Sequence, residues 1–266
     1  MTPKKSLGQH WLYDEATLDS IVDAAGVTAG DTVLEIGPGL GTLTRRLLAR
    51  GAHVTAVEFD PALAQNLSKS LLEDGPIEGD LTVVHEDILR FDLTRLPAGY
   101  KVVANIPYYL TSNLIRTLSE SANPFSAAAI LIQKEVAERV AARPGQMSIL
   151  SVSAQFYCEV SLGPVVPAEL FTPPPKVDSQ VLILEYRQQP LFEDVDTKQF
   201  FRLVKAGFSQ KRKTLVNSLS GGLAISKDEA RQLLEAADIP ENTRAQALSL
   251  EDWYALYEVA CQSLKQ

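Results

Sequence analysis

Residues 31–41 read D-T-V-L-E-I-G-P-G-L-G and decide the fold class. Residues 32–36 are rich in apolar residues, with Thr32 and one acid as the exceptions, as expected of a buried parallel strand. The glycines that follow at 37, 39 and 41 allow the backbone to turn tightly and to approach a ligand closely. The next residues, T-L-T-R-R-L-L-A-R-G, have helical periodicity and end on Gly51. Strand, glycine loop and helix in this order predict the first unit of a nucleotide-binding α/β sheet.

The same alternation continues to about residue 140. Four more apolar-rich runs bounded by turn formers are predicted strands: H-V-T-A-V-E-F-D, D-L-T-V-V-H-E-D, K-V-V-A-N and A-A-A-I-L-I-Q. A helical pattern opened by Asp60 and Pro61 lies between the first two. Alternating strands and helices predict a doubly wound α/β sheet with helices on both faces.

The pattern changes after Val140. Residues 151–160 and 177–187 are predicted to form two strands of an antiparallel edge hairpin, joined by a stiff proline-rich connection. From about Leu191 onward only helical periodicity appears. We therefore expect two domains, residues 1–190 with the sheet and residues 191–266 with helices alone.

Composition limits the function classes. The chain has 266 residues, is 45% hydrophobic and has no apolar run of membrane-spanning length or signal-peptide core, so we expect a cytoplasmic protein. Its two cysteines and three histidines show no ligand spacing, so no metal is expected. The net charge of -8 argues against a nucleic-acid partner, but clustered Lys and Arg can still form a local RNA-binding patch.

Three acids indicate the ligand of the glycine loop. A dinucleotide fingerprint requires G-x-G-x-x-G, whereas Thr42 stands where the third glycine would fall. Glu35 precedes the loop, Glu58 ends the next strand where ribose hydroxyls commonly bind, and Asp87 ends the third. Each acid alone could be a solvated loop residue. Together with the loop they favour a cationic ligand with adenine and ribose, S-adenosylmethionine.

The fourth strand ends in N-I-P-Y, Asn105 to Tyr108, at the same edge of the sheet. An adenine amino group is a poor nucleophile, and two acceptors on its N–H groups would aim its lone pair at a methyl donor. The Asn105 side chain and the Ile106 carbonyl can supply them, while Pro107 keeps Ile106 extended. Tyr108 can stack on the base. The alternative is a structural turn with both tyrosines in the core.

A base in a duplex would have to be flipped out to reach this tetrad, and its second face would then need a partner. Phe171, carried on the proline-rich connection, is the candidate. The competing interpretation is a loop phenylalanine that caps the core.

Motifs along nearly the whole chain resemble the KsgA/RsmA family of ribosomal RNA adenine dimethyltransferases. They are L-G-Q-H-W-L, E-I-G-P-G-L-G-T-L-T, A-V-E-F-D, N-I-P-Y-Y, Q-K-E-V-A-E-R-V, F-T-P-P-P-K-V-D-S and F-S-Q-K-R-K-T-L-V-N-S-L. The resemblance implies a Rossmann-like class I methyltransferase with a mostly parallel seven-stranded sheet, an antiparallel edge strand and a small helical C-terminal domain. It also implies a cytoplasmic, metal-free and monomeric enzyme.

The resemblance also assigns residues to the cofactor, S-adenosylmethionine. It places His10 and Leu12 of the N-terminal segment on it, although the family usually has Asn and Phe where this chain has His10 and Trp11. The further cofactor positions that match the family are Gly37, Glu58, Asp87 and Asn105.

The implied substrate is a pair of adjacent adenosines in the last stem-loop of 16S rRNA, each converted to N6,N6-dimethyladenosine in an assembling small subunit. The helical domain would dock on that RNA. Candidate phosphate contacts are Lys211, Arg212 and Lys213, with Arg139 and Arg143 as further ones. The alternative is a solvated charge run.

Three other functions are open on sequence grounds. An Erm-type large-subunit rRNA methyltransferase shares the fold and N-I-P-Y, but tends to have Asn in place of Asp178. A non-catalytic RNA-binding assembly factor is a second alternative, against which the intact acceptor tetrad and cofactor motifs argue. A nicotinamide dehydrogenase is the third, and the spacing of the glycine loop argues against it.

Overall fold

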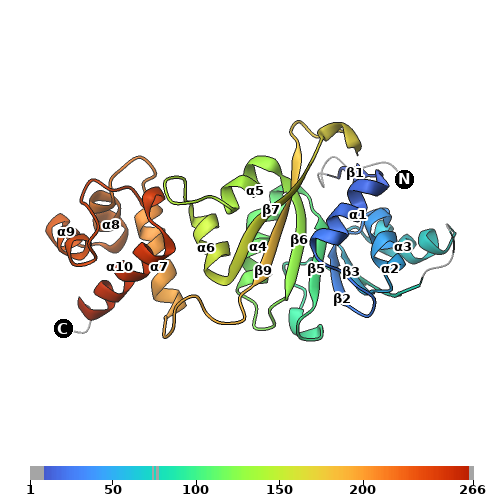
Figure 1. Cartoon of the computed structure of the whole chain (residues 1–266), viewed down its shortest axis with the longest axis horizontal. Coiled ribbons are helices and arrows are strands. Elements are labelled where there is room, and N and C mark those ends of the chain that lie inside the picture. The colour runs from blue at the N-terminus through green and yellow to red at the C-terminus, as the bar shows by residue number, and fades with distance from the viewer. Residues whose placement is uncertain (1–8, 74, 76–77, 264–266) are drawn as a thin grey trace. The chain divides into compact units, whose positions relative to one another are not determined.

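The computed structural model describes residues 9–73, 75 and 78–263 (Figure 1). The chain divides into two compact units. The first contains residues up to Glu138 together with Cys158–Tyr186, and the second contains Arg139–Tyr157 together with residues from Arg187 onward. The change after Tyr186 lies close to the expected boundary, but the segment Arg139–Tyr157 was expected in the first domain and instead packs with the C-terminal helices.

The first unit is built on a seven-stranded sheet with strand order β4-β3-β2-β5-β6-β9-β7 (Figure 1). Strands β4, β3, β2, β5 and β6 are parallel, and β9 pairs antiparallel with both β6 and β7. The predicted mostly parallel sheet with an antiparallel edge is confirmed. The strands are β2 (Thr32–Ile36), β3 (His53–Glu58), β4 (Asp80–His85), β5 (Lys101–Asn105), β6 (Ala127–Gln133), β7 (Cys158–Val166) and β9 (Ser179–Tyr186).

Helices and short turns connect these strands. They are α1 (Glu15–Ala24), α2 (Thr42–Ala49), α3 (Pro61–Glu73), α4 (Thr111–Ser119) and α5 (Lys134–Val140), with the 3-10 turns η2 (Leu93–Arg95), η3 (Tyr108–Leu110) and η4 (Ala168–Leu170). Because each parallel strand is followed by a crossover, the carboxyl ends of β2, β3, β4 and β5 lie at one edge of the sheet.

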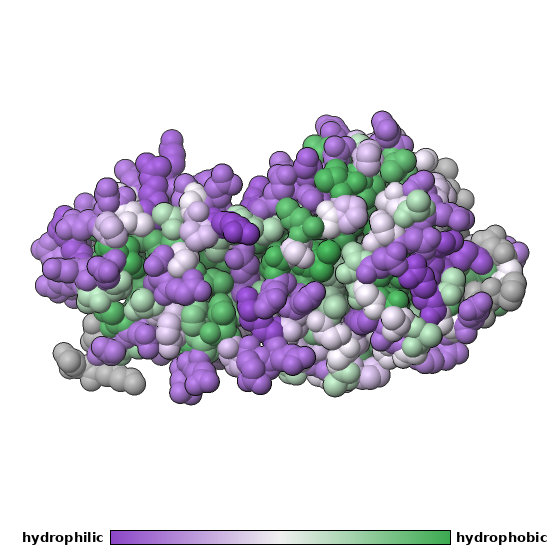
Figure 2. Space-filling view, viewed as in Figure 1, coloured by the Kyte–Doolittle hydropathy of each residue, from purple (hydrophilic) through white to green (hydrophobic). Residues whose placement is uncertain are grey.

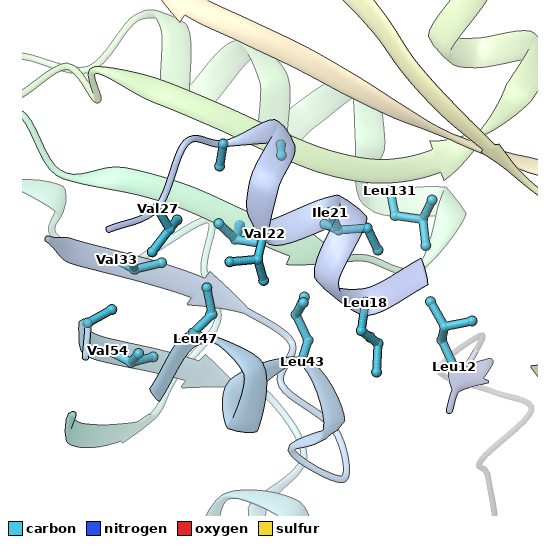
Figure 3. Packing of buried hydrophobic residues seen from close by; sticks show 14 of the residues in the cluster. Leu12, Leu18, Ile21, Val22, Val27, Val33, Leu43, Leu47, Val54 and Leu131 are labelled. Carbon is cyan, nitrogen blue, oxygen red and sulfur yellow. The ribbon is translucent and has the colours of Figure 1, made fainter. Parts of the chain in front are cut away.

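One hydrophobic cluster joins α1 and α2 to the sheet (Figure 3). Leu18 and Ile21 on α1, and Leu47 on α2, are at most 2% exposed. Their spacing puts the apolar residues of each helix on the face that meets the strands. Leu12 lies at the end of the cluster beside Leu18 and is 1% exposed, so the N-terminal segment is anchored in the core (Figure 3).

The N-terminal segment is held by a second, two-stranded sheet. Strand β1 (Trp11–Leu12) pairs antiparallel with β8 (Phe171–Thr172), with Trp11 opposite Thr172 and Leu12 opposite Phe171. Backbone pairing thus connects two segments that lie 160 residues apart. It brings the proline-rich connection to Trp11 and Leu12.

The strand predicted at residues 151–160 is wrong in its first part. Residues Ile149–Tyr157 form helix α6, and strand β7 begins only at Cys158. Ser148 is the N-cap of this helix, because its hydroxyl accepts from the Ser151 backbone N–H (3.2 Å). Val152 and Phe156, one helical turn apart, then bury their side chains in the helical unit. This packing prevails over the local alternation of S-V-S-A-Q-F.

The second unit is helical and has its own core. Its remaining helices are α7 (Thr197–Phe208), α8 (Leu215–Leu223), α9 (Lys227–Ala236) and α10 (Leu250–Ser263), with the 3-10 turn η5 (Ala245–Ala247). Its hydrophobic cluster includes the buried aromatic residues Phe156, Phe200 and Trp253. Ser226 and Glu229 form a reciprocal capping box at the start of α9.

Surface composition differs along the molecule. Hydrophilic residues cover much of the helical unit on the face shown in Figure 2. Hydrophobic residues gather on that face over β7 and β9 (Figure 2). Leu162 and Val165 of β7 are 41% and 43% exposed. None of the helices in the described parts of the chain is both long and apolar enough to cross a membrane.

Candidate functional site

A cavity in the first unit lies where the carboxyl ends of β2, β3, β4 and β5 meet the pair β1–β8. Every residue that the sequence assigned to the cofactor or to the acceptor base lines this cavity: His10, Leu12, Gly37, Glu58, Asp87, Asn105, Ile106, Pro107, Tyr108 and Phe171. The structure therefore brings the two predicted groups together in one place.

The glycine loop connects strand β2 to helix α2, and its residues Gly37 and Gly39 line the cavity. Gly37, Gly39 and Gly41 all have positive φ, at 66°, 58° and 85°. A Cβ at Gly41 would strain the backbone at this φ and would lie only 2.7 Å from Leu67 Cδ1, so the Leu67 side chain would have to shift. A Cβ at Gly37 would lie 3.9 Å from the Asn105 carbonyl oxygen, which places the loop directly beside the end of β5.

Glu58 and Asp87 face the cavity from β3 and from the end of β4. Glu58 is 6% exposed, and its carboxylate accepts from the backbone N–H groups of Gly39 (3.1 Å) and Asp60 (2.8 Å). Burial raises the pKa of Glu58, and these backbone donors oppose the rise. The Asp87 carboxylate accepts from the Leu89 backbone N–H (3.0 Å). Both acids are fixed by the backbone, as suits recognition of hydroxyl or amino donors.

Glu35 is the third acid, and it is buried rather than solvated. It is 1% exposed, lines the cavity, and neither of its carboxyl oxygens has a hydrogen-bond partner among the described residues. Burial raises its pKa to about 8, the charge of Glu58 adds to the rise, and the nearby Thr44 hydroxyl, outside hydrogen-bond geometry, opposes it. A positively charged ligand beside this carboxyl would favour its ionised form.

Asn105 ends strand β5 beside the glycine loop. Its side-chain Nδ2 donates a long hydrogen bond to the His10 carbonyl oxygen (3.5 Å). Because a carbonyl only accepts, this contact selects the amide orientation that leaves Oδ1 available to a donor in the cavity. Ile106, 3% exposed, and Pro107 continue the chain along the cavity into η3.

Tyr108 is held by strand β9. Its hydroxyl shares a hydrogen bond with the Ser179 hydroxyl (2.9 Å), and Ser179 is itself 1% exposed. Burial raises the pKa of Tyr108, so the phenol is neutral at physiological pH. The preceding residue, Asp178, accepts from the backbone N–H groups of Ala168 (3.0 Å) and Lys134 (3.0 Å) through its carboxylate and carbonyl oxygens. Asp178 thus anchors the start of β9, and Ser179 beside it holds the Tyr108 hydroxyl.

Phe171 is a core residue as well as a cavity residue. Its ring is 3% exposed and belongs to the hydrophobic cluster of α1 and α2. The competing interpretation, a phenylalanine that caps the core, therefore describes its packing. It forms part of the cavity wall rather than an exposed platform.

His10 lies between the acceptor tetrad and the proline-rich connection. Its Nδ1 is 2.7 Å from the Pro173 carbonyl oxygen, and its ring stacks on Tyr108 with centroids 5.9 Å apart and planes at 23°. The next residue, Trp11, packs on the glycine loop, where a Cβ at Gly39 would lie 3.7 Å from Trp11 Nε1.

Phe59, Ile88 and Tyr109 are among the cavity residues that were not predicted from the sequence. Phe59 and Ile88 directly follow the acids Glu58 and Asp87, and that adjacency was the available signal. Tyr109 also lines the cavity and is 67% exposed, so the question whether it belongs to the core is answered: it does not.

The predicted phosphate contacts all lie in the second unit and are exposed. Lys211, Arg212 and Lys213 occupy the turn between α7 and α8, so they are not a helix face. Arg139 and Arg143 are in the segment that joins the helical unit. None of the five makes an ion pair with a described residue, and the turn directly precedes the positive end of α8. Within the described ranges no cluster of His, Cys, Asp or Glu could hold a metal ion.

Comparisons with known proteins agree with this geometry. The family model described as "Ribosomal RNA adenine dimethylase" matches residues 1–262. The curated protein "Ribosomal RNA small subunit methyltransferase A" of Dehalococcoides mccartyi strain CBDB1 is 40% identical over 256 residues, which cover 95% of this chain and 87% of that protein. The protein of the same name from Clostridioides difficile strain 630 is 38% identical over 263 residues, 96% of this chain and 90% of its own length.

Two solved structures match nearly the whole chain. A dimethyladenosine transferase from Plasmodium falciparum has a TM-score of 0.80 at 28% identity and covers 96% of this chain and 98% of its own. The 23S rRNA methyltransferase ErmE has a TM-score of 0.72 at 29% identity and covers 94% and 98%. The match over residues 1–262, together with relatives at about 40% identity, confirms the resemblance seen in the motifs: the chain belongs to the ribosomal RNA adenine dimethylase family.

Proposed function

We propose that this protein uses S-adenosylmethionine to dimethylate the N6 amino groups of two adjacent adenosines in the 3′-terminal stem-loop of 16S rRNA during small-subunit biogenesis. The observation that carries the proposal is the adjacency of the glycine loop and the acceptor tetrad, with Gly37 and the Asn105 carbonyl in near contact in one cavity. Methyl transfer requires donor and acceptor sites in such proximity.

The residues of the cavity suit the cofactor. Glu58 and Asp87 supply fixed carboxylates for ribose hydroxyls and the adenine amino group, Gly37 allows close approach of the ligand, and Leu12 closes one side. Glu35 has no hydrogen-bond partner among the described residues, and a positively charged group beside it would favour its ionised form. When bound, S-adenosylmethionine supplies a methyl group made electrophilic by its sulfonium.

The acceptor side acts by hydrogen bonding and stacking. In the proposed complex Asn105 Oδ1 and the Ile106 carbonyl accept from the two N6–H groups, which turns the nitrogen lone pair toward the donor. Tyr108, fixed through Ser179, supports the base face, and the wall at Phe171 limits the opposite side. No strong general base is required, because the proton leaves after the nitrogen has become cationic.

The helical unit is proposed to dock on the RNA through Lys211, Arg212 and Lys213, with Arg139 and Arg143 as additional phosphate contacts. The distribution of charge supports this assignment. The second unit contains thirteen Lys and Arg against eleven Asp and Glu, whereas the first contains twelve against twenty-two. The formal net charge is therefore +2 for the second unit (13 minus 11) and -10 for the first (12 minus 22). A monomer that acts on the small subunit is the expected state.

An Erm-type enzyme is the second candidate, because ErmE has the same fold over nearly the whole chain. The small-subunit assignment is favoured by the higher identity to proteins named for that subunit. The Asp178–Ser179 pair, whose Ser179 binds Tyr108, is a further feature in its favour.

Nucleoside mass spectrometry separates these functions. The protein and S-adenosylmethionine are incubated with undermethylated small subunits and, separately, with naked large-subunit rRNA. Dimethyladenosine only in the small-subunit sample is expected. Modification only of large-subunit rRNA would make this an Erm-type enzyme, and no modification in either sample would favour a binding factor.

A further inference from the structure

The imidazole of His10 faces the acceptor side of the cavity. Its Nδ1 lies 2.7 Å from the Pro173 carbonyl oxygen. Because that oxygen can only accept, Nδ1 carries the proton and donates. The bond ties the N-terminal segment to the proline-rich connection directly after β8, next to the backbone pairing of Trp11 with Thr172.

The same ring contacts the proposed base platform. The His10 and Tyr108 centroids are 5.9 Å apart and the planes differ by 23°, which is an offset-stacked arrangement. Tyr108 is already held at its hydroxyl by Ser179. His10 therefore restrains the ring of Tyr108, while Ser179 restrains its polar end.

The backbone of His10 contacts a third residue on the acceptor side, Asn105. Its carbonyl oxygen accepts from Asn105 Nδ2 (3.5 Å), which leaves Asn105 Oδ1 for the substrate amino group. One residue thus contacts Asn105 at the end of β5, Tyr108 in η3 and Pro173 after β8. Among the described residues, the His10 side chain contacts Pro173 and Tyr108 on the acceptor side, whereas its neighbour Trp11 contacts the glycine loop.

We propose that His10 is a positioning residue for the acceptor base and that its side chain is not a ligand of the cofactor. The side chain holds Tyr108 and the proline-rich connection in fixed positions relative to each other. This inference rests on the proposed function, since it assigns a role within that reaction. It departs from the cofactor role that the resemblance implies for this position. Asn, the usual family residue, could replace the bond to Pro173 but not the ring contact with Tyr108.

Three variants of the full chain test the inference: His10→Ala, His10→Asn and His10→Phe. Phe retains a ring against Tyr108 but cannot donate to Pro173, and Asn can donate but cannot stack. His53→Ala is the matched control. His53 is an exposed histidine that pairs with Asp80, and both are the first residues of their strands, β3 and β4, at the ends away from the cavity. Each protein is assayed for KM and kcat with undermethylated small subunits and for its Kd for S-adenosylhomocysteine by calorimetry.

We expect His10→Ala to raise KM for the small subunit about five- to tenfold, with partial recovery in the Phe or Asn variant, and to leave the Kd for S-adenosylhomocysteine within about twofold of wild type. A weakened Kd with unchanged KM would overturn the inference and place the side chain on the cofactor. Unchanged values of both would make the ring contact incidental.

The wild-type assay keeps the two proposals separate. If the wild-type protein methylates small subunits but the His10 variants behave like it, only the positioning role fails. If the wild type itself transfers no methyl group, the proposed function fails. Thermal melting of each variant identifies loss of folding, and the Asn and Phe variants, which retain bulk at this site, remain informative if His10→Ala does not fold.

Discussion

Asn105 is the single side chain on which the proposed chemistry depends most. Replacing it with Ala removes one of two acceptors for the N6–H groups, and loss of one such aligned group costs about 100-fold or more in kcat. We expect Asn105→Ala to collapse turnover with little change in the Kd for S-adenosylhomocysteine, because its side-chain partner is the His10 carbonyl and not the glycine loop. Single-turnover assays and calorimetry measure the two quantities. Normal turnover in this variant would refute the acceptor clamp.

Glu35 makes stability depend on pH. Burial raises its pKa from 4.5 to about 8, so the folded state keeps a proton that the unfolded state loses above its ordinary pKa. The folded state therefore loses stability as the pH rises through this interval. We expect the free energy of unfolding of wild type to fall, relative to that of Glu35→Gln, from about pH 5 to about pH 8. Urea titrations of both proteins measure it, and parallel pH profiles would contradict the prediction.

At the scale of elements, the turn from β2 into α2 depends on Gly41. Its φ of 85° strains any other residue, and an added Cβ would lie 2.7 Å from Leu67 Cδ1. Gly26 is the matched control, since its φ is 60° but nothing lies within 4 Å of an added Cβ. We expect Gly41→Ala to destabilise the protein by about 2–4 kcal/mol and Gly26→Ala by about 1 kcal/mol. Equal losses in denaturant unfolding would show that backbone strain alone matters.

The elements also explain why Phe171 is a difficult residue to test by truncation. Its ring belongs to the core cluster and its backbone pairs with Leu12, so removal of the ring would leave a cavity at the join of β1 and β8. A loss of activity in Phe171→Ala would therefore report packing as well as base placement. The positions of the N-terminal segment and of the proline-rich connection depend on each other for the same reason.

At the scale of the whole molecule, the two units carry different charge. The exposed turn Lys211–Arg212–Lys213 has no ion-pair partner among the described residues. Changing all three to Gln should weaken RNA binding and reduce the slope of log affinity against log salt by about 2–3, since each phosphate contact contributes roughly one unit. Folding should be unaffected, because the side chains are exposed.

A charge-matched control tests whether location matters. Lys69, Arg116 and Lys227 are exposed cations on α3, α4 and α9, and changing these three to Gln alters the net charge equally. Filter binding of small-subunit rRNA at several salt concentrations compares the two triple variants. If both lose affinity to the same extent, net charge and not the turn governs RNA binding.

The local sequence determined most of the sheet and the contents of the cavity. The buried runs of β2, β3, β5 and β6 and the helices α2, α3, α7 and α9 follow from apolar periodicity and turn formers, which are properties of neighbouring residues. Parallel topology then brings acids and the acceptor tetrad at successive strand ends to one edge, so Glu58, Asp87 and Asn105 could be placed together before the structure was known.

Tertiary structure alone decided the remainder, because it depends on contacts between residues distant in sequence. Residues 151–157 are helical since Val152 and Phe156 bury against the helical unit, although their local pattern alternates. Glu35 is buried by α2 and the strands, and this burial raises the pKa of its carboxyl above the ordinary value. His10 meets Tyr108 and Pro173 only because β1 pairs with β8, 160 residues away, and no local pattern encodes that pairing.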